Sequence, residues 1–136
     1  MKLQTATRLA LYAVIDLAGA AGTARSASDI AASHGASVAH MAKVMQTLAR
    51  AGIVEATRGA RGGYRFAANP RRTSLLDVIE VFEPVAVTAH VAANPGRTDA
   101  AVSDALDRVL AEIDDIARAT LGSITLETLL KTVRAA

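Results

Sequence analysis

Apolar side chains recur every three or four residues along much of the chain, a pattern that predicts α-helices. A first helix is expected around residues 9–17, capped by Thr5 or Thr7. A second, short helix is expected after Ser28, whose hydroxyl can cap its free amides. This helix should end at Gly35, because glycine suits a left-handed backbone at a helix C-terminus.

A third, amphipathic helix is predicted between Ser37 and Gly52, with an apolar face formed by Val38, Met41, Val44, Met45 and Leu48. The second and third helices have the spacing of a helix-turn-helix. In that interpretation Ala31 is small where the helices cross, Gly35 makes the turn, and the buried contacts are Ile30, Val38, Met41 and Val44. Taken alone, this spacing leaves DNA binding and an ordinary helical hairpin equally open.

A glycine- and arginine-rich centre follows, flanked by two short runs, residues 53–56 and 64–67, that suit β-strands. This pattern predicts a hairpin, and a helix-turn-helix followed by a hairpin is a winged helix. Glycines at the hairpin tip would let the backbone approach DNA closely, and arginines would reach phosphates or a narrow minor groove. The alternative is that the glycines only make the turn while the arginines keep an exposed edge soluble. The residues concerned are Arg58, Gly59, Arg61, Gly62, Gly63 and Arg65.

The polar face of the third helix supplies further candidates for DNA contact. Ser37, His40 and Lys43 lie near its N-terminal end, where such helices reach base edges, and Arg50 could contact a phosphate. Ser37 could equally serve only as a helix cap, and a surface histidine such as His40 can have no role at all.

The remainder of the chain predicts a fourth helix, a loop and a long helix. Ser74 should cap the fourth helix, which Pro84 should end, and the segment after it has no helical period. From Thr98 to about Leu121, apolar residues alternate spacings of four and three; they are Val102, Leu106, Val109, Ile113 and Ile116, followed by Thr120. These five apolar residues, called the apolar stripe below, predict a homodimer; the alternative is packing on the first helix of the same chain.

After Gly122, which is expected to break the long helix, a last short helix could be capped by Ser123 or Thr125.

Charge separates the two parts of the chain. Residues 1–75 carry ten Lys and Arg against three acids, net +7, and residues 76–136 carry five against ten, net −5. A basic part joined to an acidic one indicates that the first faces a polyanion. The alternative of a winged helix that binds protein is disfavoured by Lys43, Arg50 and the hairpin arginines.

Composition excludes several kinds of chemistry. The chain has no cysteine, so disulfides and thiolate-held metal sites are excluded. His34, His40 and His90 are not at metal-ligand spacing, and no catalytic set is evident, so we expect neither an enzyme nor a metal site. A small-molecule or metal sensor around His90 is a minor alternative.

The apolar run near the start is interrupted by Arg8 and Asp16, which predicts a cytoplasmic protein without a membrane span.

Four stretches together resemble the Rrf-type (Rrf two) family of bacterial winged-helix transcription regulators, which includes IscR, NsrR and CymR. They are MKLQTATRLALYAVIDLA, SASDIAASHGAS, LARAGIVEATRGARGGYRFA and TSLLDVIEVFEP. The resemblance implies a dimeric regulator, usually a repressor, with a recognition helix over residues 37–48 and a wing at Arg58, Gly59, Gly62, Gly63 and Tyr64. It further implies that the long helix pairs with its twin and that the last helix docks near the partner's DNA-binding domain.

The resemblance also implies a division into three parts: a winged helix-turn-helix DNA-binding domain over residues 1–83, a flexible loop over 84–97, and dimerisation and docking helices over 98–136. Many relatives hold an iron–sulfur cluster through three cysteines in that loop, which here has none, and one variant uses an acid near the position of Arg8. We therefore expect DNA binding without a cluster, released by an unidentified effector or protein partner. Arg61 replaces a glycine common in relatives and adds charge at the wing tip.

Overall fold

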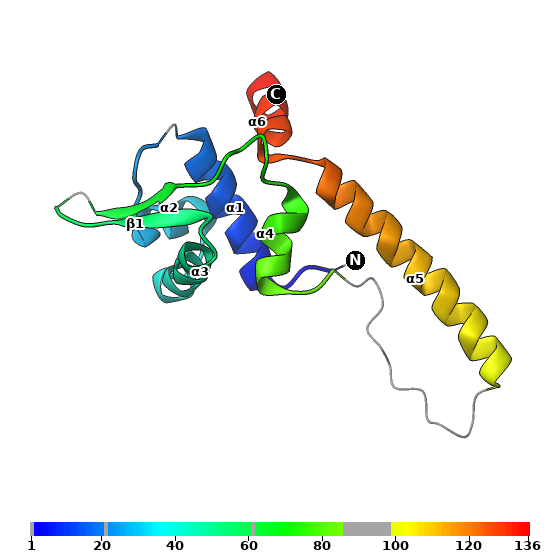
Figure 1. The fold of residues 1–136 in the computed structure, drawn as a ribbon. Coiled ribbons are helices and arrows are strands. Elements are labelled where there is room, and N and C mark those ends of the chain that lie inside the picture. The colour runs from blue at the N-terminus through cyan, green and yellow to red at the C-terminus, as the bar shows by residue number, and fades with distance from the viewer. Residues whose placement is uncertain (1, 21, 61, 86–98) are drawn as a thin grey trace.

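The computed structural model describes residues 2–20, 22–60, 62–85 and 99–136, and within them the chain forms helices and one two-stranded hairpin (Figure 1). The elements in order are α1 (Thr5–Gly19), α2 (Ala27–His34), α3 (Val38–Arg50), β1 (Val54–Thr57), β2 (Gly63–Phe66), α4 (Leu75–Phe82), α5 (Ala100–Ser123) and α6 (Leu126–Ala135). Helices α1 to α4 and the hairpin form one body, called the winged helix below, and α5 extends away from it. The predicted fold class, mainly α with a small hairpin, is confirmed. The predicted flexible loop lies outside the described residues, apart from Pro84 and Val85.

The N-terminal caps of the first two helices differ from those that the sequence predicted. Helix α2 begins after Ser26, whose hydroxyl accepts a hydrogen bond of 3.0 Å from an amide of the first turn, so Ser28 lies inside the helix. Helix α1 begins after Gln4 and has no side-chain cap from its own segment. Instead Glu83, next to the end of α4, accepts hydrogen bonds from the Gln4 amide at 2.9 Å and from the Thr7 hydroxyl. Contacts between distant segments therefore complete a helix end that no local residue caps.

The core of the winged helix lies where α1, α2 and α3 meet. Its largest fully buried side chains include Leu17, Ile30, Met41, Met45 and Leu48. Ala31 is also fully buried, and Gly35 has the left-handed backbone (φ 62°) that turns the chain from α2 into α3, as predicted. The helix-turn-helix is thus held by aliphatic packing and by one glycine turn.

Val38 does not belong to this core, which corrects the sequence prediction. Its side chain is 51% exposed, whereas Met41 and Val44 farther along the same helix are buried. Val38 is the first residue of α3, and side chains on a helix lean toward its N-terminus, so Val38 points beyond the region where the helices cross.

The hairpin pairs Val54 with Phe66 and Thr57 with Gly63 in an antiparallel register. A third segment joins it, because Arg25, just before α2, exchanges backbone hydrogen bonds of 2.9 and 2.8 Å with Tyr64. A Cβ atom on Gly63 would collide with the Arg25 backbone, so glycine is required there for close packing. Strand β2 is therefore paired on both sides, with β1 on one side and with Arg25 on the other.

Helix α6 completes the core of its own chain. Leu126 and Leu130 are buried, and the backbone around Thr73 pairs with that around Thr125, with the Leu126 amide donating to the Thr73 carbonyl at 2.9 Å. Figure 1 shows α6 (red) beside the winged helix. Leu126 and Leu130 of α6 are covered within their own chain, whereas Val133 on the same helix is 56% exposed. Docking of α6 near the partner's DNA-binding domain stays a prediction. Ser74 caps α4 and Thr125 caps α6, both as predicted.

Helix α5 continues through Gly122 to Ser123, so the expected break at Gly122 is wrong. Ile124 has an extended backbone and ends the helix, while Gly122 keeps the helical conformation beside Leu76. Glycine lowers the stability of a helix by about 1 kcal/mol relative to alanine, and the helical turns around it can offset this cost.

Candidate nucleic-acid interface

Helix α3 presents a polar and basic face to solvent, opposite the face that enters the core. Lys43, Gln46 and Arg50 are exposed, and His40 is partly buried. The Ser37 hydroxyl accepts a hydrogen bond of 3.0 Å from the His40 amide, so Ser37 is the helix cap, a role that leaves DNA contact open. Gln46 was not among the predicted contacts, although its amide suits an adenine edge. The exposed face carries positive charge and has no acidic side chain.

The tip of the wing is an exposed turn shaped by glycines. Gly59 has a left-handed backbone (φ 113°), and a Cβ atom on Gly62 would lie 2.9 Å from two backbone oxygens. Arg58 is exposed at the start of this turn, whereas Arg61 lies outside the described residues. The glycines are therefore explained by the turn itself. Arg58 is exposed and has no ion-pair partner among the described residues, so its charge is available to a ligand.

The remaining predicted wing residues have structural contacts of their own. Arg65 forms an ion pair with Glu55 on the opposite strand, and each side chain is about half exposed, 50% and 46% respectively. Tyr64 is partly buried against the core, and Gly63 packs on Arg25. These three residues hold the wing together, which makes Arg58 the clearest candidate for a phosphate contact among the described wing residues.

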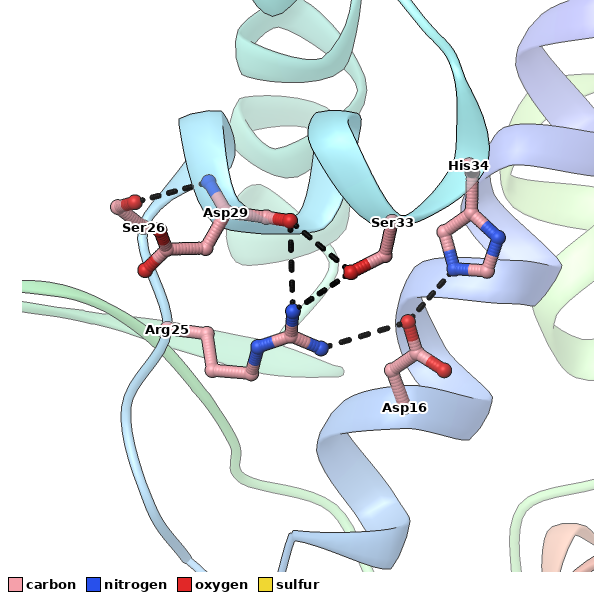
Figure 2. A network of polar contacts seen from close by, with 6 residues as sticks. All are labelled: Asp16, Arg25, Ser26, Asp29, Ser33 and His34. Atoms are coloured by element: carbon pink, nitrogen blue, oxygen red, sulfur yellow. Dashed lines mark hydrogen bonds and ion pairs between the residues drawn. The ribbon is translucent and has the colours of Figure 1, made fainter.

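A polar network fixes the wing and α2 to the first helix (Figure 2). One carboxylate oxygen of Asp16 in α1 lies 2.6 Å from His34 Nε2 and 3.5 Å from a guanidinium nitrogen of Arg25. The same guanidinium donates hydrogen bonds to the Ser33 hydroxyl at 2.9 Å and to the Asp29 carbonyl at 3.3 Å. We call these residues, Asp16, Arg25, Asp29, Ser33 and His34, the Asp16 network.

The Asp16 network sets the geometry of the interface. Arg25 pairs with the wing through its backbone and with α1 and α2 through its side chain, so one residue relates the wing to the helix-turn-helix. The His34 ring also stacks on Tyr12 of α1, with ring centres 4.9 Å apart. One weak signal of this network is present in the sequence, because Asp16 is the single acid among the first 28 residues.

The apolar stripe on α5 is exposed along its full length. Val102, Leu106, Val109, Ile113 and Ile116 are 61, 55, 54, 41 and 60% exposed, and no residue of α5 is buried. The alternative that this stripe packs on α1 of its own chain is therefore wrong. Helix α5 meets α4 at its C-terminal end, where Arg118 pairs with Glu80.

The structure has the parts of a winged-helix DNA-binding protein. These are a helix-turn-helix with a basic exposed face, a hairpin wing, and a long helix with an exposed apolar stripe. The chain belongs to the Rrf2 family, described as iron-dependent transcriptional regulators, whose family pattern matches residues 3–132. It is accordingly a DNA-binding transcription regulator of the Rrf2 type, as the four sequence stretches predicted.

Relatives of several kinds support this assignment. The chain is 44% identical over 133 residues to BadM of Rhodopseudomonas palustris, named as an HTH-type transcriptional regulator, with 98% of this chain and 83% of BadM covered. Its fold is similar to that of CymR, the global cysteine regulator of B. subtilis, with a TM-score of 0.76 and 28% identity over 97% of this chain and 98% of CymR. IscR of T. potens matches with a TM-score of 0.70 and 29% identity, covering 98% and 88%.

The residues present do not fit the iron chemistry that the family description names. The chain has no cysteine, and residues 86–98 contain His90 as their single metal-binding type of side chain. Across the described ranges, no three His, Asp or Glu side chains gather closely enough to hold a metal ion. An iron–sulfur cluster bound by three thiolates therefore has no ligands in this chain. Among the described residues, no helix has the length and hydropathy to span a membrane.

Proposed function

We propose that the protein is a homodimeric repressor of the cytoplasm that binds operator DNA through α3 and the wing. It does so without an iron–sulfur cluster and has no catalytic activity. The observation that carries the proposal is the separation of surfaces: exposed Lys43, Arg50 and Arg58 lie on the winged helix, while the unburied apolar stripe lies on α5.

The apolar stripe supports the dimer. Five large aliphatic side chains at heptad spacing are each more than two-fifths exposed in the single chain. Pairing α5 with the same helix of a second copy would remove them from water and would present two winged helices to two half-sites. The net acidic charge of the exposed faces of α5 keeps this part of the molecule away from DNA.

The absence of cysteine supports regulation by something other than a cluster. A chain that binds its operator without a cofactor needs an effector or a protein partner for release, and we leave the chemistry of that signal unassigned. The three-part division of the chain at residues 83 and 97 remains part of this proposal.

The test is fluorescence anisotropy of the purified protein on its own promoter fragment and on a scrambled fragment, over a range of salt concentrations. Tight, promoter-selective binding supports the proposal; weak binding that is equal on both fragments contradicts it. Replacing Arg58 by Ala should lower the magnitude of the slope of log affinity against log salt by ~0.9, because one phosphate contact is lost. The matched control is Arg108→Ala on exposed α5, which should leave the slope unchanged.

A further inference from the structure

Val38 stands out on the surface of the winged helix. Among the described residues, the exposed large apolar side chains outside α5 and α6 are Tyr12, 41% exposed, and Val38, 51% exposed. Tyr12 stacks on His34, which accounts for its position. Val38 lies at the first position of the recognition helix, where an apolar side chain contributes little to the fold.

The neighbours of Val38 leave room for a close approach to a groove. Ala39 is exposed and Ala42 partly exposed, so the first turns of α3 carry small side chains beside the valine. Positions 38, 42 and 46 lie on one edge of the helix at spacings of four residues, which places Gln46 two turns farther along that edge. The charges of α3, Lys43 and Arg50, come later and are both positive.

We propose that Val38 contacts the C5-methyl group of a thymine in each operator half-site. That methyl group is the apolar feature that a base pair presents in the major groove, and valine has no hydrogen-bonding atoms with which to read anything else there. Residues at the N-terminal end of a recognition helix are the ones that reach base edges. This inference rests on the proposed function, in which α3 enters the major groove.

The test compares wild type with Val38→Ala on operators in which each thymine in turn is replaced by deoxyuridine, which lacks the methyl group. Wild type should lose about fourfold in affinity per half-site at one position, the effect of one buried methyl group. Val38→Ala should bind the natural operator more weakly and should be insensitive to deoxyuridine at that same position. Sensitivity at all other positions should be unchanged.

The controls separate this inference from the proposed function. Val133→Ala removes an equally exposed valine, 56% exposed on α6, and should behave as wild type at every position. Wild type could select the operator over scrambled DNA and yet show no position at which its sensitivity to deoxyuridine is lost in Val38→Ala. In that case the thymine contact is wrong and the proposed function stands. If wild type does not select the operator, both fail. Val38→Ala should fold normally, because the side chain lies outside the core.

Discussion

The winged helix and helix α5 use the same aliphatic side chains in opposite ways. In the winged helix, Leu17, Ile30 and Met41 are fully buried, whereas on α5 Leu106 and Ile113 are 55% and 41% exposed. Both regions have helical periodicity of apolar residues, so this periodicity shows that a face will be covered and leaves open which molecule covers it. The apolar residues of the winged helix are covered within the chain, whereas no described residue of the chain covers the apolar stripe of α5.

The two regions differ in polar contacts as well. The Asp16 network ties three segments of the winged helix together, and Glu83 completes the start of α1. Helix α5 joins the rest of the described chain near its C-terminal end, through the Arg118–Glu80 pair and the backbone pairing next to it. Three substitutions test this contrast.

The largest effect is expected for Ile113→Asp in the apolar stripe. In the proposed dimer, a carboxylate at this position would be buried without a partner, so the dimer should dissociate. Because two linked binding sites gain about 10²- to 10⁴-fold over one, operator affinity should fall at least about 100-fold. Analytical ultracentrifugation and anisotropy measure the two quantities, and Asp107→Ala on the exposed surface of α5 is the control. A dimer that persists in Ile113→Asp would show that α5 is not the contact.

A smaller effect, on stability, is expected for Gly63→Ala in the wing. The added methyl group would collide with the Arg25 backbone, and such overpacking costs about 1–3 kcal/mol. The midpoint of urea unfolding should fall by the corresponding amount, and the wing should separate from Arg25. An unchanged midpoint would mean that the pairing of Arg25 with Tyr64 adds nothing to stability.

The smallest effect, opposite in sign, is expected for the same substitution in α5. Gly122 lies within the helix, and a Cβ atom there would be in ordinary contact, 3.4 Å from Leu76. Gly122→Ala should therefore raise the free energy of unfolding by about 0.5–1 kcal/mol. Urea unfolding measured beside Gly63→Ala checks the sign. A loss of stability would indicate that another surface packs tightly against Gly122 in the proposed dimer.

The features that the sequence predicted are those with local causes. Gly35, Ser37 and Ser74 act within one turn of the helices they end or begin, so their residue types were sufficient. The heptad spacing of the apolar stripe could also be recognised in the sequence, because it depends on helical geometry alone.

The features that the sequence did not predict depend on segments far apart in the chain. Glu83 accepts a hydrogen bond from the amide of Gln4, 79 residues earlier, at the start of α1, and Arg25 pairs with Tyr64 across α2, α3 and β1. Val38 was assigned to the core because it follows the periodicity of α3, but a helix end extends beyond the surfaces that bury the middle of the helix. The predicted DNA contacts Ser37, His40, Lys43 and Arg50 do lie on or beside one solvent-facing side of α3; contact with DNA itself remains a prediction.

The position of α6 has a consequence for folding during synthesis. Leu126 and Leu130 pack into the winged helix, yet the ribosome makes them after all of α5. Until then, a patch of α1 and the backbone near Thr73 lack their contacts, and closing the intervening loop costs chain entropy that grows slowly with its length. The core of the nascent winged helix therefore stays incomplete while the apolar stripe is already exposed, and it is completed only when the chain is nearly finished.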